Sequence, residues 1–223
     1  SVYARLAILI TICLIFGGGA LFALLEWNNP GTIGNLTPGG KILASLFQSV
    51  TLRTAGFASF NQDALTEASK LLSNILMFVG GSSGSTAGGV KTVTMGLVVL
   101  SAVSTMRGRR QVTVFRRSIS QQDISNAVSV ALLVLGLSLF GAAVLTVCDR
   151  CSFLNAIYET TSALCTVGLT TGITGTLCAA SKLILIVFMF FGRVGIMTIG
   201  VGFMMGDRAK ERVQYAQTKV MIG

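Results

Sequence analysis

Residues 163–174 read ALCTVGLTTGIT, a run of small residues and glycines that follows a short apolar segment and precedes a longer one. A partial copy, TLRTAGFASF, lies at 51–60. In each stretch a Thr-x-Gly sequence leaves the backbone carbonyl groups largely uncovered by side chains. We therefore ask which kind of fold needs exposed carbonyl groups at two places in an apolar chain.

The two stretches belong to an internal repeat. Aligning Gly56 with Gly168 sets an offset of 168 − 56 = 112 residues. The same offset pairs Leu52 with Leu164, Thr54 with Thr166, Met77-Phe78 with Met189-Phe190, and Gly80 with Gly192. Repetition of a whole supersecondary unit is a stronger signal than either motif alone.

The composition indicates an integral membrane protein. Of the 223 residues, 52% are hydrophobic and 11% are charged, and the mean hydropathy is +0.76. A soluble domain carries about a quarter charged residues. The net charge of +9 does not indicate nucleic-acid binding, because the basic residues gather in one loop and the tail. The start, SVYARLAILI, is typical of the interior of a longer chain rather than of a signal peptide.

Four apolar stretches predict membrane crossings. Three of them, 6–25, 124–148 and 183–206, have the length of ordinary spanning helices. The fourth, 71–106, would reach about 54 Å as a straight helix, which is too long for a bilayer. Its middle, GGSSGSTAGGVKT at 80–92, is rich in glycine and serine, which are poor helix formers. We predict one crossing whose helix is broken there, with the irregular backbone buried in protein or facing a water-filled cavity.

The arginines set the orientation. The loop RGRRQVTVFRR at 107–117 and the basic tail 207–223 are expected in the cytoplasm, where the arginines also meet anionic lipid headgroups. Both Thr-x-Gly turns then lie on the outer face. The apolar segments before them, 42–52 and about 152–164, are too short to span, so we predict re-entrant helices. A ring of backbone carbonyl oxygens after such helices can replace the water shell of a cation; the alternative is a pair of external turns in which Thr caps a helix.

These motifs resemble the Trk/Ktr/HKT superfamily of potassium transporters, particularly the Ktr-type membrane subunit of bacteria. TLRTAGF and LCTVGLT look like its third and fourth filter segments. MFVGGSSGSTAGGVKT and MFFGRVGIMTIG resemble the second helices of its third and fourth units. The resemblance implies an all-α integral membrane fold of two tandem membrane–pore loop–membrane units, half of a pseudo-fourfold pore. Residues 1–117 would form the third unit, 118–206 the fourth and 207–223 a cytoplasmic tail.

The resemblance also implies the functional residues. The filter carbonyl groups would belong to Thr54, Ala55, Gly56, Phe57, Thr166, Val167, Gly168 and Leu169. An intramembrane gating loop would comprise Gly80, Gly81, Ser82, Ser83, Gly84, Ser85, Thr86, Ala87, Gly88 and Gly89, with Lys91 at its end. Arg193 would place a positive charge in the pore. The implied function is potassium uptake across the plasma membrane by a multi-pass subunit, with sodium as a second ion, no cofactor and no enzymatic activity. The implied partners are a second copy in a homodimer, membrane lipid and a cytosolic nucleotide-binding (RCK-type) regulatory subunit.

Alternative interpretations remain for several features. Two of four units would also fit a truncated, non-conducting remnant or an assembly scaffold. Arg193 could instead pair with Glu159 or with a carbonyl cluster, and the small residues of 80–89 could serve helix packing. A phosphate-binding loop is excluded because Val90 separates Gly89 from Lys91. Cys148 and Cys151 form either an incidental pair or a strained disulfide, since a zinc site would need more ligands, and Cys165 is assigned no chemistry.

Overall fold

The computed structural model describes residues 2–82, 85, 87–108, 112–114 and 117–195. Several predicted features lie outside these ranges, namely Ser83, Gly84 and Thr86 of the loop, part of the arginine-rich loop, residues 196–206 of the last predicted crossing, and the basic tail. The described part is helical apart from turns, loops and one short hairpin.

The first unit contains four helices. Helix α1 (Val2–Glu26) is followed by α2 (Pro38–Thr51), the short 3-10 turn η1 (Gln62–Ala64), α3 (Glu67–Phe78) and α4 (Thr92–Met106). Threonine hydroxyl groups cap two of them: Thr37 accepts from the Gly40 N–H at the start of α2, and Thr66 accepts from the Ser69 N–H at the start of α3. Such caps satisfy backbone donors that have no partner within the helix.

The second unit repeats the order of the first as far as its last described helix. It comprises α5 (Gln121–Asp149), α6 (Phe153–Leu164), the 3-10 turn η2 (Ile173–Gly175) and α7 (Ala179–Val194). Between the units, β1 (Thr113–Val114) pairs antiparallel with β2 (Arg117–Ser118). The all-α prediction missed this hairpin, which lies within the predicted arginine-rich loop.

The predicted helix break is visible in the element boundaries. Helix α3 ends at Phe78 and α4 begins at Thr92, so the interruption falls on the glycine- and serine-rich stretch. The predicted short segments appear as α2, with 14 residues, and α6, with 12 residues. Both are too short to cross a bilayer of about 30 Å at about 1.5 Å per residue.

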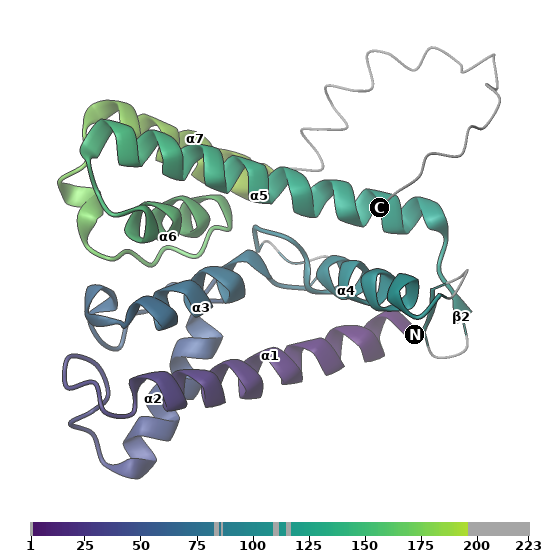
Figure 1. Cartoon of the computed structure of the whole chain (residues 1–223), viewed down its shortest axis with the longest axis horizontal. Helices are drawn as coiled ribbons and strands as arrows, with labels where there is room; N and C mark the ends of the chain where they lie inside the picture. Colours follow the sequence, from purple (N-terminus) through teal and green to yellow (C-terminus); the bar gives the residue numbers. More distant parts are fainter. Residues whose placement is uncertain (1, 83–84, 86, 109–111, 115–116, 196–223) are drawn as a thin grey trace.

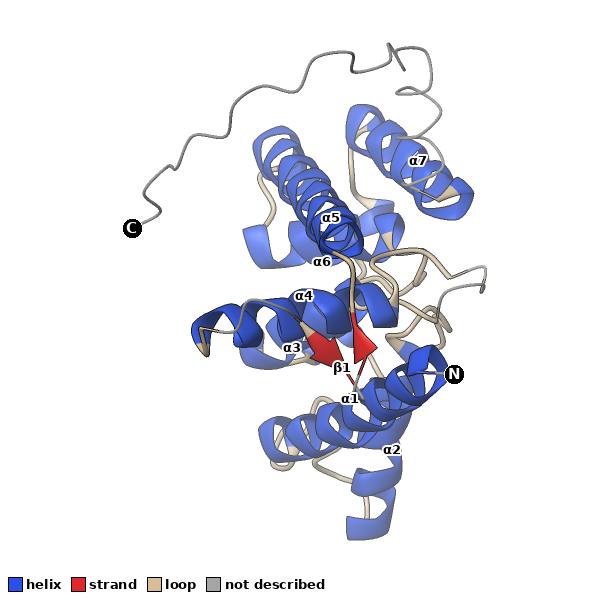
Figure 2. Ribbon diagram, turned by 90° about the vertical axis from the view of Figure 1, so that its right-hand side faces the viewer, coloured by secondary structure: helices blue, strands red, loops and turns tan. Residues whose placement is uncertain are grey.

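The two units lie side by side. Figure 2 shows α5, α6 and α7 gathered on one side of the molecule and α1 and α2 on the other, with α3 and α4 between them. Figure 1 shows α6 alongside one half of α5. This half lies away from the N-terminus of the chain and away from the β-hairpin. Between the units, α3 packs against α6 and α4 packs against α5.

One buried core joins both units. It includes Phe22, Leu52 and Met77 from the first unit and Tyr158 and Leu164 from the second. The outward surfaces of α1, α5 and α7 carry many exposed large apolar side chains, such as Leu24 at 78% and Val147 at 80% exposure. Among the described helices, α1 and α5 are long and apolar enough to cross a membrane. An apolar surface of this extent is typical of a protein face that meets lipid or another protein.

Candidate functional site: two turns, a loop and a cavity

Each predicted filter stretch begins where a short helix ends. Helix α2 ends at Thr51 and α6 ends at Leu164, and each Thr-x-Gly motif begins two or three residues later. The structure therefore places both stretches at the carboxyl ends of helices that are too short to span a bilayer. A helix carboxyl end carries about half a negative charge, which favours a nearby cation.

The backbone of the two turns is unusual in the same way. Thr54 has φ of 66° and Thr166 has φ of 55°, while Gly56 and Gly168 have φ of 78° and 91°. A β-branched residue with positive φ is a conformational outlier, and the described residues include one other non-glycine residue with positive φ, Arg150. Alternating positive and negative φ turns successive peptide groups the same way, so N–H groups gather on one side and carbonyl groups on the other.

A hydroxyl group from each short helix fixes the end of its turn. Thr51 donates to the Phe57 carbonyl oxygen over 2.7 Å and accepts from the Phe57 N–H over 2.8 Å. Ser162 donates to the Leu169 carbonyl oxygen over 2.6 Å and accepts from the Gly168 N–H over 3.2 Å. The carbonyl groups of Phe57 and Leu169, which were predicted as ion ligands, thus point toward the helix behind them.

The two turns touch each other. A Cβ atom added to Gly56 would overlap the Val167 carbonyl oxygen, so the second turn presents a carbonyl group to the first. Gly168 is exposed and has nothing within 4 Å of its Cβ position, whereas its neighbours Val167 and Leu169 are buried. The structure thus brings the two Thr-x-Gly motifs, 112 residues apart, to one place.

The loop between α3 and α4 is closed at its base. Gly80 N–H donates to the Val90 carbonyl oxygen over 2.9 Å, and Val90 N–H donates to the Phe78 carbonyl oxygen over 3.1 Å. The Lys91 ammonium group donates to the carbonyl oxygens of Ser85 and Ala87, over 3.1 and 2.5 Å. The lysine therefore holds the described part of the loop in a folded-back form.

The loop lies directly against the second turn. Gly88 N–H donates to the Thr166 hydroxyl oxygen over 2.8 Å. A Cβ atom at Gly89 would lie 3.0 Å from the Cys165 sulfur, so the buried Cys165 side chain packs on the loop. On the other side, Arg53 at the first turn donates to the Thr92 hydroxyl oxygen over 3.2 Å, and Thr92 donates to the Gly80 carbonyl oxygen over 3.1 Å. Both turns are thus tied to the broken helix.

A cavity of about 590 Å³ lies on the side of this loop that faces away from the second turn. Gly88 and Lys91 line it, together with Asp123 of α5 and Arg193 near the end of α7. The two predicted basic residues therefore share one cavity.

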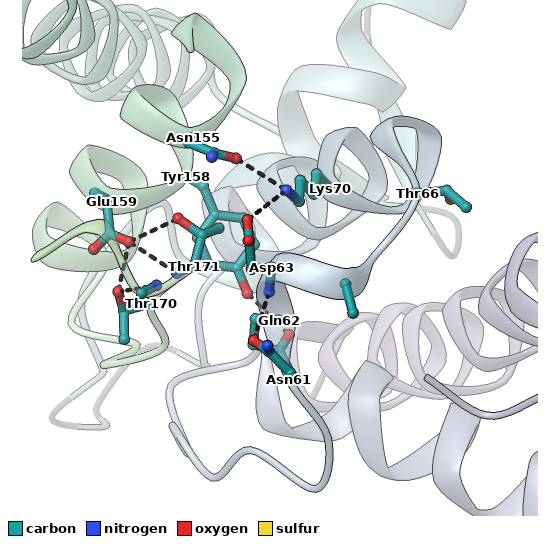
Figure 3. Close-up of polar contacts among 12 residues, drawn as sticks. Asn61, Gln62, Asp63, Thr66, Lys70, Asn155, Tyr158, Glu159, Thr170 and Thr171 are labelled. Carbon is teal, nitrogen blue, oxygen red and sulfur yellow. Dashed lines mark hydrogen bonds and ion pairs between the residues drawn. The ribbon is translucent and has the colours of Figure 1, made fainter. Parts of the chain in front are cut away.

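Buried carboxylates behind the turns were not predicted. Glu159, which is 4% exposed, accepts from Thr170, Thr171 and Thr174, the residues that follow the second turn. Figure 3 shows this cluster together with the neighbouring contacts Tyr158–Gln62 and Lys70–Asn155, which join the two units. Glu159 is the one charged residue of the predicted re-entrant segment 152–164, but its partners were not predicted, because they are 11 to 15 residues away.

One further carboxylate in each unit joins two of its helices. Glu26 at the end of α1 accepts from Thr66 N–H over 3.0 Å, and Asp149 at the end of α5 accepts from Cys178 N–H over 2.6 Å. Thr66 and Cys178, the N-cap residues of α3 and α7, are separated by the repeat offset of 112. The sequence carried a signal for this pair, since EASKLL at 67–72 and AASKLI at 179–184 align at the same offset.

The described cysteines form no disulfide bond. Cys148 and Cys151 are both free, so the disulfide alternative finds no support. The described residues contain no group of three or more histidine, cysteine or carboxylate side chains suited to a metal ion.

Comparisons with known proteins agree with one another. The family model described as TrkH, cation transport protein, matches residues 6–211. Ktr system potassium uptake protein B of Bacillus subtilis (strain 168) is 38% identical over 200 residues, covering 90% of this chain and 44% of the relative. The potassium/sodium uptake protein NtpJ of Enterococcus hirae is 33% identical over 229 residues, covering 100% of this chain and 50% of the relative.

A solved structure has the same fold. The potassium transporter TrkH from Vibrio parahaemolyticus matches with a TM-score of 0.74 at 21% identity, covering 89% of this chain and 44% of that chain. This chain therefore spans about half the length of the relatives that it matches.

Proposed function

This chain belongs to the TrkH family of cation transport proteins, and from that premise we propose that it carries half of a potassium-conducting path across the plasma membrane. It would act as the membrane subunit of a Ktr/Trk-type uptake system, with two pore-loop units as outlined above. Membership of this family of transporters also agrees with the expectation that the chain is not an enzyme.

The observation that carries the proposal is the pair of strained turns. Thr54 and Thr166 both have positive φ, and each is followed two residues later by a glycine with positive φ. Strain of this kind costs about 1–3 kcal/mol per residue and persists where function requires it. Carbonyl groups of Thr54–Phe57 and Thr166–Leu169 would coordinate the dehydrated cation. Phe57 and Leu169 would close the filter through their bonds to the helices behind them.

The loop 80–89 would be the gate. Gly88 binds the Thr166 hydroxyl group and also lines the cavity, so the loop separates the second turn from the cavity. In the predicted orientation this cavity opens toward the cytoplasm. Lys91 and Arg193 outnumber Asp123 in its lining and would make it repulsive to a resting cation, because like charges disfavour each other in a space of low dielectric constant.

The remaining parts of the proposal concern partners and ions. We propose a homodimer surrounded by lipid, and a cytosolic nucleotide-binding subunit that docks on the arginine-rich loop and the tail. Potassium is the proposed main ion. Sodium is the second candidate, because the name of NtpJ describes a potassium/sodium uptake protein.

The test compares two glycines with the same backbone demand. Gly168 and Gly108 have φ of 91° and 66°, and neither has an atom within 4 Å of its Cβ position. Gly108 follows α4 and belongs to neither turn. Cells that lack their own potassium uptake would express the full-length protein or a variant, and rubidium and sodium uptake would be measured. We expect Gly168→Ser to lower the preference for rubidium over sodium, and Gly108→Ser to leave it unchanged. Equal preference in all three proteins would contradict the filter assignment.

A further inference from the structure

Glu159 holds a negative charge inside the protein close to the second turn. Its carboxylate accepts from the Thr170 hydroxyl group over 2.6 Å, from the Thr171 N–H over 2.8 Å and from the Thr174 hydroxyl group over 2.8 Å. The Thr171 hydroxyl group adds a fourth bond of 3.1 Å. All four donors are neutral, so these bonds order the carboxylate without cancelling its charge.

The first unit has a neutral residue at the equivalent position. Thr51 and Ser162 play the same part in the two units, because each binds the carbonyl oxygen of the residue after the turn glycine. Counting three residues back from these hydroxyl groups gives Gln48 and Glu159. These two residues are 111 rather than 112 positions apart, because Thr51 lies one residue closer to its turn glycine than Ser162 does. Gln48 is fully buried and binds Gln62 over 2.6 Å. The two units therefore differ by one charge at matched positions behind their turns.

The position of the charge relates it to the path of the ion. Residues 170–174 begin directly after Leu169, so the segment that Glu159 holds is the one that leaves the second turn (Figure 3). A buried charge is screened less than an exposed one. A fixed negative charge near a narrow opening raises the local cation concentration and the rate of association.

We propose that Glu159 is a positioning residue that also raises the affinity of the second turn for the transported cation. Its carboxylate orders the segment that leaves the second turn, and its charge makes this side of the opening attractive to a monovalent cation. In the other unit, Gln48 orders the segment that leaves the first turn, but it carries no charge. This inference rests on the proposed function, because it requires that a cation pass the two turns.

The experiment measures rubidium influx into proteoliposomes that contain the full-length protein. Glu159→Gln keeps the size and the acceptor oxygen of the side chain and removes its charge. We expect its KM for rubidium to rise about three- to tenfold at low ionic strength with little change in the maximal rate, because the lost attraction acts on cation binding. The increase should shrink when about 0.5 M N-methylglucamine chloride shortens the screening length. Glu159→Asp keeps the charge and should stay near the wild-type KM.

Glu26 provides the matched control. It is 1% exposed, and it accepts four bonds from Asn29, Thr32 and Thr66, but it joins the ends of α1 and α3 rather than the segment after a turn. Glu26→Gln should therefore leave the KM unchanged even where it lowers the yield of folded protein. Gln48→Glu adds a charge in the other unit and should lower the KM, which tests the proposal independently of the folding of Glu159→Gln.

The outcomes separate the two proposals. A wild-type protein without rubidium influx would overturn the proposed function, and this inference with it. A conducting wild type with an unchanged KM in both Glu159→Gln and Gln48→Glu would overturn the inference alone. A KM increase in Glu159→Gln that added salt does not reduce would also overturn it, because a purely structural defect has no such salt dependence.

Discussion

At the scale of single residues, a backbone angle says more about the two turns than their sequence does. Thr54 and Thr166 adopt positive φ although β-branched side chains disfavour it. The bonds of Thr51 and Ser162 to the far ends of the turns help to keep this conformation. The Thr-x-Gly pattern predicted two turns, but the strain at threonine is a property of three-dimensional packing that a short motif does not reveal.

Gly192 should be required for the approach of α7 to the second turn. A Cβ atom at this position would overlap the Leu164 carbonyl oxygen and lie 3.0 Å from the Thr166 side chain. We expect Gly192→Ala to destabilise the protein by about 1–3 kcal/mol, which is typical of overpacking. The measurement is the midpoint of thermal unfolding of the detergent-purified protein.

Gly136 is the control for this substitution. It lies within α5, and its Cβ position has no atom within 4 Å. Gly136→Ala should leave the midpoint unchanged or raise it, because alanine favours a helix by up to about 1 kcal/mol over glycine. Equal midpoints for the two variants would show that α7 does not need a bare backbone at Gly192.

At the scale of elements, the sequence predicted the helix break and both short helices, because these depend on local composition. Glycine and serine at 80–89 interrupt the helix between Phe78 and Thr92, and α2 and α6 lie close to the predicted 42–52 and 152–164. The closure of the loop was not predicted. It depends on Arg53, whose bond to Thr92 spans 39 residues, and on Lys91, which turns back onto the loop.

Thr92 should help to keep this loop in place. Its buried hydroxyl group donates to the Gly80 carbonyl oxygen and accepts from Arg53. Thr92→Val would leave both partners without this bond, at a cost of about 1–3 kcal/mol. If the loop obstructs the path, we expect basal rubidium influx to rise, by up to about tenfold for 1.4 kcal/mol of differential destabilisation.

Thr105→Val is the matched variant for the loop. It makes the same substitution in the same helix, where the exposed hydroxyl group donates to the Ser101 carbonyl oxygen, and its influx should equal that of the wild type. Folded Thr92→Val protein with influx at or below the wild-type level would contradict a role of this bond in closing the loop.

At the scale of the whole molecule, the two units share a sequence repeat, but equivalent residues in them make different contacts. The offset of 112 relates Lys70 of α3 to Lys182 of α7. Lys70 donates to Asp63 and to Asn155 of the other unit, each over 3.1 Å. Lys182 is exposed and donates to the Gly175 carbonyl oxygen within its own unit. Sequence reasoning found the repeat but not this difference, because a repeat aligns residues within units and is silent on contacts between them.

This difference gives a paired test of how the units are held together. The Lys70 side chain is 11% exposed and Asp63 is 56% exposed, so the ion pair is partly screened, while the bond to Asn155 lies at the boundary between the units. We expect Lys70→Met to destabilise the protein by about 1–3 kcal/mol, because Asn155 loses a charged hydrogen-bond partner. Lys182→Met should change stability by less than about 0.5 kcal/mol. Thermal unfolding of both purified variants measures the contrast, and equal midpoints would mean that the packing of α3 against α6 holds the units together without the lysine.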